Sequence, residues 1–519
     1  MPSSNTAPDV STDLIDPATT TDRTVYQTPL YYQCLISVLK PLYRLQVWRR
    51  SSQRDNYQQE VEQRFGKQYP PRPLTNTDYD KGVIWCHAVS LGETNTVAPL
   101  LDALLADGYQ VWLTNTTQTG FARGASRFAT EIEQGQMSHS YVPVDSPAVI
   151  ERFLAHVQPV AALFVETELW ANILTMLCDK RIPSILVNGR LSLSSFQRYQ
   201  KIGAVSTSMM KNLAVIIAQD SDSAKRYRQL GASSAQIRVA GSLKWVINTP
   251  KVSNKATESD AEHESIEAQK DKLKKAFSIA GRPVWVAAST HQGEEETALL
   301  WHQQLLAQSA LKDALLIIVP RHPERFEAVA ELIQKTELNM TQRSTEVPID
   351  ADTQVYLADS MGEMMTWYQL ADVALVGGSL VDIGGHNPVE ATSVATPVLM
   401  GRYTQSCQTV VDKLAEVGAL YQPHNPSYRP VQLDPLSHVD EHSTESSQQA
   451  TKPRSGKRAF NTDDADLYQQ LAVWLTDLAL AAQAGLAGKQ VTVQQQAVLS
   501  RQFAMIKDVI EQRVDQEGL

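Results

Sequence analysis

The chain has 519 residues, more than one hydrophobic core usually holds, so two domains are expected. Its composition, 43% hydrophobic and 20% charged, is that of an ordinary globular protein, and its net charge of -10 excludes a general nucleic-acid-binding protein, which needs a basic surface. The four cysteines are too widely spaced for a zinc ribbon or a CxxC redox motif: Cys34, Cys86, Cys178 and Cys407.

The N-terminal region divides into two parts. Residues 1–25 are polar and lack the apolar stretch of a secretory signal, so they are predicted to be a disordered tail. Residues 26–54 contain no acidic residue and combine five basic residues with many apolar and aromatic ones. Lys40, Pro41 and Arg44 interrupt the apolar stretch, which is therefore shorter than the ~20 clean residues of a membrane-spanning helix. The segment predicts either a membrane-associated helix lying on anionic lipid or a first helix packed on its own domain.

Residues 55–248 alternate short apolar runs with amphipathic stretches, which is the pattern of βαβ units around a parallel sheet. They are interpreted as an N-terminal, acceptor-binding Rossmann-like domain. The predicted strands cover residues 83–86, 111–114, 161–165, 184–187 and 215–218.

A charged, polar segment at 249–278 is predicted to be a linker that runs into a helix, and the alternation then begins again. Residues 279–490 are interpreted as a C-terminal, nucleotide-sugar-binding Rossmann-like domain, interrupted at 425–464 by an insertion with the composition of a disordered segment. Residues 491–519 are predicted to be a C-terminal helix. The predicted strands of this domain cover residues 284–288, 315–319, 354–357, 373–376 and 397–400.

The first candidate site is the turn at 86–93, which leads from a strand into a helix and has Glu93 as its one carboxylate. Ligands of open α/β sheets lie at this end of the strands, so Glu93 is a candidate catalytic base. Ser90 and Glu93 also have the S-x-x-E spacing of a helix capping box, which would make the same carboxylate structural. The spacing alone leaves both interpretations open.

Two more strand ends of the first domain carry charged residues. Glu166 and Glu168 follow a buried strand, where they could favour a helix N-terminus or orient sugar hydroxyls. Lys244 lies just before the linker, where it is either a solvated surface group or a cation facing an interdomain cleft.

The second domain has more candidates. Arg321, after Pro320 at a strand end, is suited to binding a phosphate with two parallel hydrogen bonds. The segments 289–295 and 359–364 also follow strands. The glycine pairs at 377–378 and 384–385 could let the backbone approach a ligand, and Asn387 and Pro388 resemble the N-cap and first residue of a phosphate-binding helix. Glu390, one turn later, could accept hydrogen bonds from a ribose, so ligand binding is favoured here.

The missing motifs narrow the chemistry. The sequence has no P-loop, no G-x-G-x-x-G after a strand, no H-E-x-x-H and no D-x-D at a strand end. A nucleotide-sugar enzyme that needs no metal or other cofactor is therefore expected.

Taken together, the segments resemble the bacterial 3-deoxy-D-manno-octulosonic acid (Kdo) transferases that act on the lipid A precursor. The motifs in order are HAVSLGE, ETELWAN, NGRLS, GSLK, STHQGEE, VPRHPERF, DSMGEM and GGSLVDIGGHNPVE. The resemblance implies an α/β fold of the GT-B type, with two Rossmann-like doubly wound domains facing a cleft and an N-terminal membrane-associated helix. It also implies a location on the cytoplasmic face of the inner membrane. Ala171, Trp245 and the loop at 401–407 depart from the family pattern.

The resemblance further implies an inverting glycosyltransferase of the EC 2.4.99 type that moves Kdo from CMP-Kdo to the tetra-acyl disaccharide 1,4'-bisphosphate precursor of lipid A in lipopolysaccharide biosynthesis. The number of Kdo residues transferred is left open. Anionic inner-membrane lipid is an implied partner and nucleic acid is not. By likeness of motif, Glu93 is the general base, and Glu166 and Lys244 stabilise the transition state. The residues that match CMP-binding positions are Pro320, Arg321, Met361, Gly362, Glu363, Asn387, Pro388, Val389 and Glu390.

Two alternatives stay open at this point. One is a transferase or epimerase that uses a UDP-sugar, because such enzymes share the two-domain plan. The other is a lipid-binding scaffold without catalytic activity, for which Glu93 would be dispensable.

Overall fold

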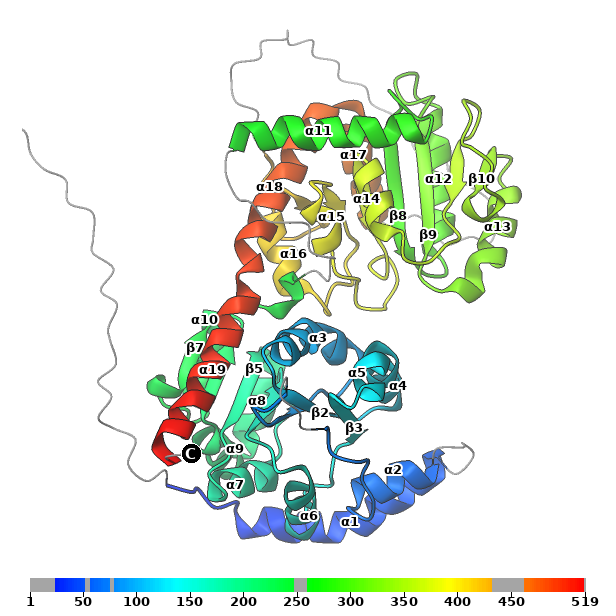
Figure 1. Ribbon diagram of the computed structural model, residues 1–519. Coiled ribbons are helices and arrows are strands. Elements are labelled where there is room, and N and C mark those ends of the chain that lie inside the picture. Colours follow the sequence, from blue (N-terminus) through cyan, green and yellow to red (C-terminus); the bar gives the residue numbers. More distant parts are fainter. Residues whose placement is uncertain (1–23, 52–56, 75–78, 247–258, 432–461, 518–519) are drawn as a thin grey trace, which may run out of the picture. The chain divides into compact units, whose positions relative to one another are not determined.

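The computed structural model describes residues 24–51, 57–74, 79–246, 259–431 and 462–517, and the chain forms two compact units (Figure 1). The first comprises the chain up to Ser242 together with Ser500–Leu519, and the second comprises Leu243–Leu499. The predicted tail at 1–25 falls almost wholly outside the described residues, as does the first part of the predicted linker.

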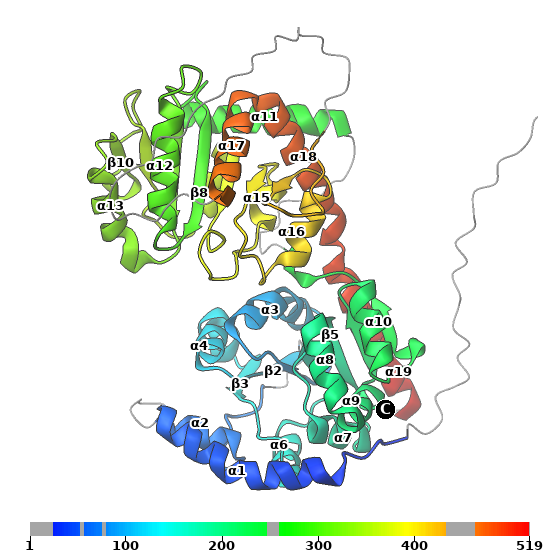
Figure 2. The same ribbon diagram turned by 180° about the vertical axis from the view of Figure 1, so that it is seen from behind.

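The first unit is built on a seven-stranded sheet whose strands are all parallel, in the order β3-β2-β1-β4-β5-β6-β7. Helices α3 (Leu91–Ala106) and α4 (Gln118–Arg127) cover one face, and α6 (Pro147–Val157), α7 (Ala171–Asp179) and α9 (Gly203–Asn212) cover the other (Figures 1 and 2). The strands are buried along almost their whole length because helices cover both faces. They span β1 Val83–His87, β2 Gln110–Asn115, β3 Met137–Tyr141, β4 Ala161–Val165, β5 Ser184–Gly189, β6 Val215–Ala218 and β7 Ile237–Val239.

The second unit repeats this plan with a parallel sheet in the order β10-β11-β9-β8-β12-β13-β14. Its helices include α12 (Glu294–Leu306), α13 (Phe326–Gln334), α14 (Met364–Leu370), α15 (Val389–Ser393) and α16 (Gln408–Ala415). Apolar clusters fill both faces of the sheet. The strands span β8 Val284–Thr290, β9 Leu315–Pro320, β10 Met340–Gln342, β11 Val355–Leu357, β12 Val373–Val376, β13 Val398–Leu399 and β14 Leu420–Tyr421.

Two doubly wound α/β units confirm the predicted fold class. The prediction omitted four strands, β3, β7, β10 and β14. Three of them have only two or three residues, and β3 (MSHSY) carries polar side chains that the surrounding structure buries. Hydrophobic pattern alone could not identify them.

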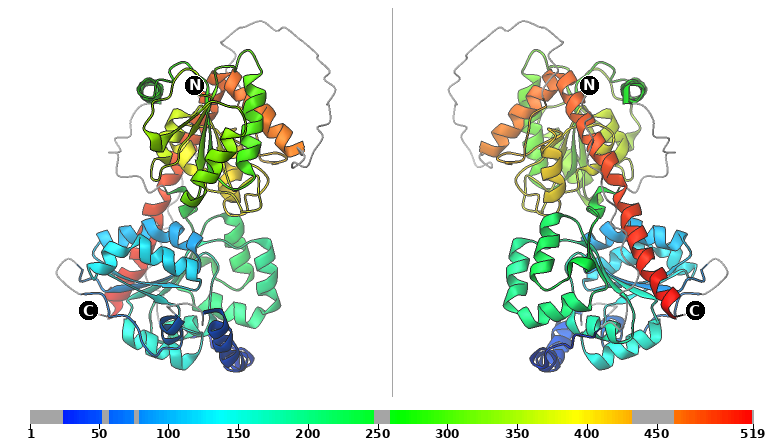
Figure 3. Two further views of the ribbon diagram at one scale, coloured as in Figure 1. Left: turned by 90° about the vertical axis from the view of Figure 1, so that its right-hand side faces the viewer. Right: turned by 90° about the vertical axis from the view of Figure 1, so that its left-hand side faces the viewer.

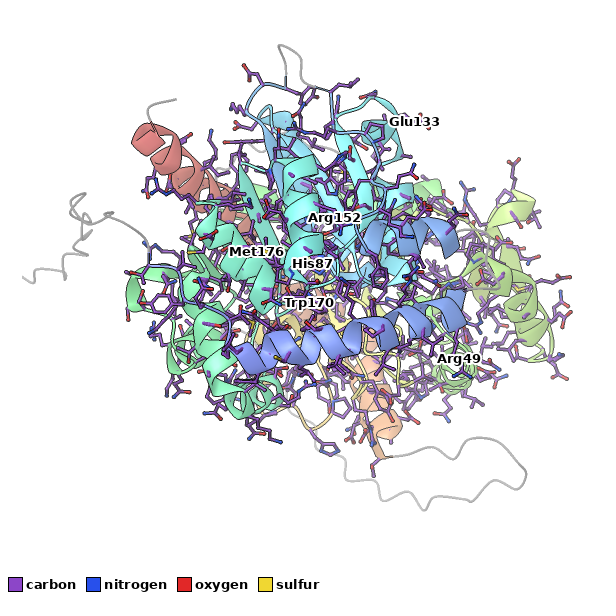
Figure 4. The ribbon with its side chains drawn as sticks, turned by 90° about the horizontal axis from the view of Figure 1, so that it is seen from below. Arg49, His87, Glu133, Arg152, Trp170 and Met176 are labelled. Atoms are coloured by element: carbon purple, nitrogen blue, oxygen red, sulfur yellow. The ribbon has the colours of Figure 1, made fainter. Side chains whose placement is uncertain are left out.

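Helix α1 (Leu30–Ser51) lies along the outside of the first unit (Figures 3 and 4). Its inner side is held by Val47, which packs on Val61 and Phe65, and by Tyr32, whose hydroxyl donates to Asp145 Oδ2 at 2.8 Å. Its outer side displays a stripe of exposed side chains at helical spacing, which we call the apolar stripe: Tyr31, Leu35, Val38, Leu42 and Leu45. The helix therefore packs on its own unit and still presents an apolar face. The side chains of Trp48 and Arg50, and all of Arg54, lie outside the described residues.

The Tyr32 hydrogen bond should be a main anchor of α1. Asp145 is buried and also accepts the backbone N–H groups of Asn172 and Ile173. Burial raises the pKa of Asp145 to about 6, and the Tyr32 bond opposes that rise. Tyr32→Phe removes one bond to a charged acceptor, a loss of about 1.5–3 kcal/mol, so α1 amides should exchange with solvent at least ~10-fold faster and the pKa of Asp145 should rise further. Hydrogen-exchange mass spectrometry measures the first effect. Tyr31→Phe on the exposed side is the matched control, and equal exchange in both variants would contradict this role.

The domain limits of the structure differ from those drawn on the sequence. The first unit ends at Ser242 instead of residue 248, which places Lys244 in the second unit. Helix α11 (Ser259–Ala276) occupies most of the predicted linker at 249–278 and is attached to the second unit by Lys270 and Lys274, which both pair with Asp372. Lys274 and Asp372 are buried, so this ion pair fixes the helix to the start of β12.

The predicted C-terminal helix at 491–519 is two helices. Helix α18 (Leu478–Gln496) belongs to the second unit, whereas nearly all of α19 (Val498–Glu517) belongs to the first. In the first unit Gln502 donates to the Gly241 carbonyl at 3.0 Å and accepts from the Asn188 N–H at 3.2 Å. The end of the chain thus packs against residues of the first unit that lie up to 314 positions earlier in the sequence.

Most of the predicted insertion at 425–464 lies outside the described residues, but its two edges do not fit the prediction. Asn425 donates to Asp412 Oδ1 at 3.1 Å, and Tyr428 packs edge-on against Tyr421. Helix α17 (Thr462–Thr476) begins with Asp463 buried and paired with Arg402. Both edges are therefore part of the folded second unit.

Candidate functional site

The first candidate region lies at the carboxyl ends of β1 and β4. These strands are neighbours, and the strand order reverses between them, because β2 and β3 follow on one side and β5 to β7 on the other. Such a reversal point is where open α/β sheets bind ligands. Glu93 follows β1 and Glu166 follows β4, so the fold brings both predicted catalytic carboxylates to this place.

Glu93 lies in the first turn of α3 and is half-buried. Its Oε2 accepts the Val89 N–H at 2.8 Å, and its own N–H donates to Ser90 Oγ at 3.4 Å. Ser90 is therefore the N-cap of α3, as the spacing suggested, whereas the Glu93 carboxylate accepts the N–H of Val89, the residue before the N-cap. The carboxylate lies near the carboxyl end of β1, where ligands of such sheets bind, so its position is compatible with a structural role and with that of a general base.

Glu166 has a left-handed backbone conformation, with φ at 60°. For a residue other than glycine this costs of the order of 1–3 kcal/mol, and such strain is concentrated at functional sites. Asn188 in β5 and Ser289 in β8 share this conformation, with φ at 52° and 54°. Tyr227 donates to the Glu166 carbonyl at 3.3 Å and helps to hold the turn. Nearby, burial raises the pKa of Glu168.

The second candidate region lies at the corresponding reversal point of the other sheet, between β8 and β12. The turn after β12 contains the first glycine pair. Its backbone N–H groups at Gly378, Ser379 and Leu380 donate to the Glu294 carboxylate at 2.8, 3.1 and 2.9 Å. Glu294 is fully buried and also accepts the His291 N–H at 2.9 Å.

Glu294 therefore fills the backbone nest that the glycine pattern suggested for a ligand. A Cβ at Gly377 would collide with the Ser289 carbonyl and the Glu294 carboxylate, so this glycine is required by internal packing. Gly384 needs its positive φ of 106° to make the turn that follows. The expectation of close ligand approach is corrected for the first glycine pair, whose N–H groups bind Glu294. For the second pair it stays a prediction.

The neighbouring carboxylate, Glu295, forms a buried ion pair with Arg325. The two N–O distances are 2.5 and 3.1 Å, and Thr290 also donates to Glu295 at 2.7 Å. This interaction joins the end of β8 to η3 (Pro323–Arg325), the turn that follows Arg321. Arg325 is thereby committed to structure, whereas Arg321 is exposed.

Two histidines meet across the reversal point. His291 Nε2 lies 2.8 Å from His386 Nε2, and His322 lies edge-on to His291 with ring centroids 5.4 Å apart. Burial, Arg321 and the neighbouring histidines lower the pKa of His386 to about 4, and the pKa of His291 is lowered for similar reasons.

Arg321 interacts electrostatically with this histidine pair and with Glu390, another predicted nucleotide-binding residue. Its positive charge lowers the pKa of both His386 and Glu390, although burial raises the pKa of Glu390 overall. Pro320 ends β9 opposite Thr290 of β8. Arg321, His386 and Glu390 therefore gather at one edge of the second sheet.

Asn387 and Lys244 form another group in the second unit. The Asn387 side chain donates to the Lys244 carbonyl at 2.6 Å, and Lys244 Nζ donates to the Ser406 carbonyl at 3.0 Å. The loop at 401–407 packs on the second glycine pair through the Ser406 N–H, which donates to Gly384 at 2.9 Å. Although this loop departs from the family pattern, it contacts both the glycine turn and Lys244.

The helix that follows Asn387 is shorter than expected. It starts at Val389 with Pro388 as the N-cap residue, and it has only five residues. Asn387 Oδ1 still accepts the Val389 N–H, at 3.3 Å. A helix this short has little dipole, so the predicted helix N-terminus is not the main source of positive potential here. The Arg321 guanidinium provides it instead.

Met361, Gly362 and Glu363 lie between β11 and α14, and Glu363 is the N-cap of α14. Met361 is 61% exposed, and no atom of the described residues beyond its chain neighbours lies within 4 Å of the position that a Cβ on Gly362 would take, so this segment is open to a ligand. The Glu363 carboxylate binds Arg343 with N–O distances of 3.0 and 3.1 Å and also accepts the Ser360 hydroxyl. These bonds lower the pKa of Glu363 and keep it ionised.

Comparison with known proteins identifies the family of this chain. Residues 59–247 match the family model described as 3-deoxy-D-manno-octulosonic-acid transferase (kdotransferase). The chain is 36% identical over 393 residues to the 3-deoxy-D-manno-octulosonic acid transferase of Haemophilus influenzae, covering 75% of this chain and 85% of that protein. The chain belongs to the Kdo transferase family. It is also 34% identical to the Bordetella pertussis transferase, over 76% of this chain and 87% of the relative.

A Kdo transferase is a glycosyltransferase of lipopolysaccharide biosynthesis, so it takes a sugar-nucleotide donor and a lipid acceptor. Among solved structures, this chain is similar to the C-terminal CMP-Kdo binding domain of WaaA from Acinetobacter baumannii. The identity is 29%, the match covers 45% of this chain and all of that domain, and the TM-score is 0.32.

Several residues of this Kdo transferase site were given no individual role from the sequence: His291, His386, Glu294, Arg325 and Arg343. Of these, His386 counted only as part of the segment for which ligand binding was favoured. The first four lie within motifs that follow strands, so their position was a usable signal. What each of them does depends on partners that are 30 to 95 residues away. Arg343 lies outside every motif, and only its contact with Glu363 identifies it.

Proposed function

We propose that this Kdo transferase uses CMP-Kdo as donor and the tetra-acyl disaccharide 1,4'-bisphosphate precursor of lipid A as acceptor. The observation that carries the donor proposal is the place of Arg321 at the edge of the second sheet. Its N–H donates to the Thr290 carbonyl at 3.0 Å, directly before His291, and His291 is hydrogen-bonded to His386. A guanidinium next to neutral imidazoles can bind a phosphate, and the open segment at 361–363 can accept a base. The family resemblance supports cytidine as that base.

Transfer then requires that an acceptor hydroxyl attack the anomeric carbon of Kdo while the bond from that carbon to the CMP phosphate breaks. Glu93 takes the hydroxyl proton, and Arg321 stabilises the charge that grows on the leaving CMP. Glu166 and Lys244 are proposed to stabilise the transition state. Attack opposite the leaving group inverts the anomeric centre.

No step of this scheme needs a metal. Among the described residues, no three His, Cys, Asp or Glu side chains are grouped so as to hold a metal ion. Metal independence stays a prediction, and activity measured in the presence and absence of EDTA tests it.

The direct test is to incubate the purified full-length protein with CMP-Kdo and the lipid A precursor and to weigh the products. A mass increase of one or more Kdo residues is expected, and the number transferred follows from the same spectrum. The companion measurement is thermal stabilisation by nucleotides. Stabilisation by UDP and not by CMP, with no Kdo transfer, would contradict the proposal in favour of a UDP-sugar enzyme.

We further propose that the protein works at the cytoplasmic face of the inner membrane and that α1 lies on the lipid surface. Within the described residues no single helix is long and apolar enough to span a bilayer; one sharply bent helix pair, Thr462–Thr476 with Leu478–Gln512, passes that test by length and composition. Support for a surface location comes from the apolar stripe, which is flanked by the exposed Arg44 and Arg49. Arg49 is labelled on α1 in Figure 4. Apolar residues inserted at headgroup depth beside arginines suit an anionic membrane.

The apolar stripe should therefore control lipid binding. Leu35→Glu combined with Leu42→Glu removes two leucines that are each worth up to about 1.5–3 kcal/mol on full burial. Binding to vesicles of mixed zwitterionic and anionic lipid, measured by co-sedimentation, should fall at least ~10-fold while CMP affinity is unchanged. Val347→Glu, an exposed apolar position of the second unit, is the control. Equal vesicle binding by the double variant and the control would contradict the proposed role of α1.

A further inference from the structure

The His291–His386 contact has a geometry that restricts its protons. The two Nε2 atoms are 2.8 Å apart, the ring planes differ by 8°, and the ring centroids are 5.1 Å apart. The rings thus meet edge to edge in nearly one plane, which is the arrangement of an N–H···N hydrogen bond. One Nε2 must carry a proton and the other must be bare. The pair can be neutral or carry one positive charge, but two Nε2–H groups cannot face each other at this distance.

Charged groups surround the pair on three sides. The segment after β9 contributes the guanidinium groups of Arg321 and Arg325 and the imidazole of His322. The start of α12 contributes the carboxylates of Glu294 and Glu295, and α15 contributes that of Glu390. The α12 carboxylates are already engaged, one by backbone N–H groups and the other by Arg325. The cations and burial therefore lower the pKa values of both histidines, and the pair is neutral near pH 7 when no anion is bound.

We propose that the His291–His386 pair takes up one proton when a phosphate-bearing nucleotide binds beside Arg321. This deepens the proposed function and rests on it, because it requires the donor phosphate to occupy that place. The proton goes to Nδ1 of the ring that donates its Nε2–H, so the bond between the two rings is kept. No covalent bond to carbon or phosphorus changes.

The direction of the effect follows from electrostatics. Burial and the charge of Arg321 lower the pKa of His386 to about 4. A phosphate offsets the charge of Arg321 and so raises the pKa of the pair, while the effect of burial remains and keeps it below the ordinary histidine value of ~6.5. Because the bound form has the higher pKa, binding tightens as pH falls through the bound pKa and levels off below about 4. The protonated pair would also offset the charge that the phosphate gains as the sugar leaves.

Titration calorimetry of CMP at pH 6, in buffers with different ionisation enthalpies, measures the protons taken up. The CMP phosphate itself titrates with a pKa of about 6, but this contribution is common to all variants. The wild type should take up more protons than His386→Gln, up to roughly 0.7 if the bound pKa reaches the ordinary value of ~6.5. His291→Gln should lose the same amount. His424→Gln, which removes an exposed histidine of the second unit, should behave as the wild type.

A measurement on the wild type alone protects the test if either variant fails to fold. The methyl ester of CMP is a phosphodiester and has no phosphate group that titrates near pH 6. Its affinity for the wild-type protein should be at least ~10-fold higher at pH 5 than at pH 8. A pH-independent affinity, or equal proton uptake by wild type and both pair variants, overturns the inference and leaves the proposed donor standing. Failure of the wild type to bind CMP at any pH would instead overturn the proposed function.

Discussion

Glu93→Gln should lower the rate of Kdo transfer by ~10²–10⁴-fold, the usual contribution of a general base, while CMP affinity stays unchanged. The substitution is informative because it separates the two roles that Glu93 can have. A glutamine side-chain oxygen can still accept the Val89 N–H that Glu93 accepts at 2.8 Å, so the cap of α3 is kept. The amide cannot take a proton from the acceptor.

Ser90→Ala is the matched control, since it removes the other side of the cap and leaves the carboxylate. It should cost about 1 kcal/mol of stability, measured by chemical unfolding, with little loss of transfer. A scaffold without catalytic function predicts no Kdo transfer by any variant. A purely structural Glu93 predicts that Glu93→Gln transfers Kdo at nearly the wild-type rate. If Glu93→Gln transferred Kdo at the wild-type rate, the general-base assignment would have to be abandoned.

Glu294→Ala is expected to be the most destabilising single substitution in the second unit. It leaves four backbone N–H groups without their acceptor in a buried turn. Each buried unsatisfied group costs about 1–3 kcal/mol, and removing a buried charge recovers only part of that loss. We expect a loss of about 3 kcal/mol or more, together with loss of CMP binding, because the turn also positions His291 and His386.

Chemical denaturation monitored by tryptophan fluorescence measures this loss. Glu294→Gln should lie between alanine and wild type, since one amide oxygen replaces one of the two acceptors and the amide NH₂ faces an N–H group. Glu296→Gln is the control from the same turn. Glu296 is exposed and accepts only the Gly293 N–H at 3.0 Å, so its replacement should cost no more than about 1 kcal/mol. Similar stabilities for Glu294→Ala and Glu296→Gln would show that the Glu294 bonds contribute little.

Some predictions from sequence depended on local pattern and were confirmed. Apolar runs of strand length, separated by amphipathic stretches, indicated two doubly wound units, and the strand ends indicated where polar groups gather. Glu93 and Glu166 reach a strand-order reversal point because each directly follows a central strand. That is a local property of the chain.

Other predictions failed because the role of the residue depends on a contact with a partner far along the chain. Lys244 was assigned to the first domain, but its contacts with Asn387 and Ser406 lie 143 and 162 residues away and belong to the second unit. The glycine pairs were interpreted as places where the backbone approaches a ligand. At the first pair, however, the backbone N–H groups bind Glu294, which lies 84 residues before Gly378. No spacing within a motif carries this information.

By itself, the sequence determined the fold class, the motif order that marks the family, and the strand ends at which its charged residues lie, because hydrophobic period and turn chemistry act over a few residues. Only the tertiary structure decided how those residues are used: that Glu294 binds backbone N–H groups, that His291 and His386 share a hydrogen bond, and that α1 leaves an apolar stripe uncovered. The physical reason is that burial and pairing depend on which distant segments the packed sheets bring into contact.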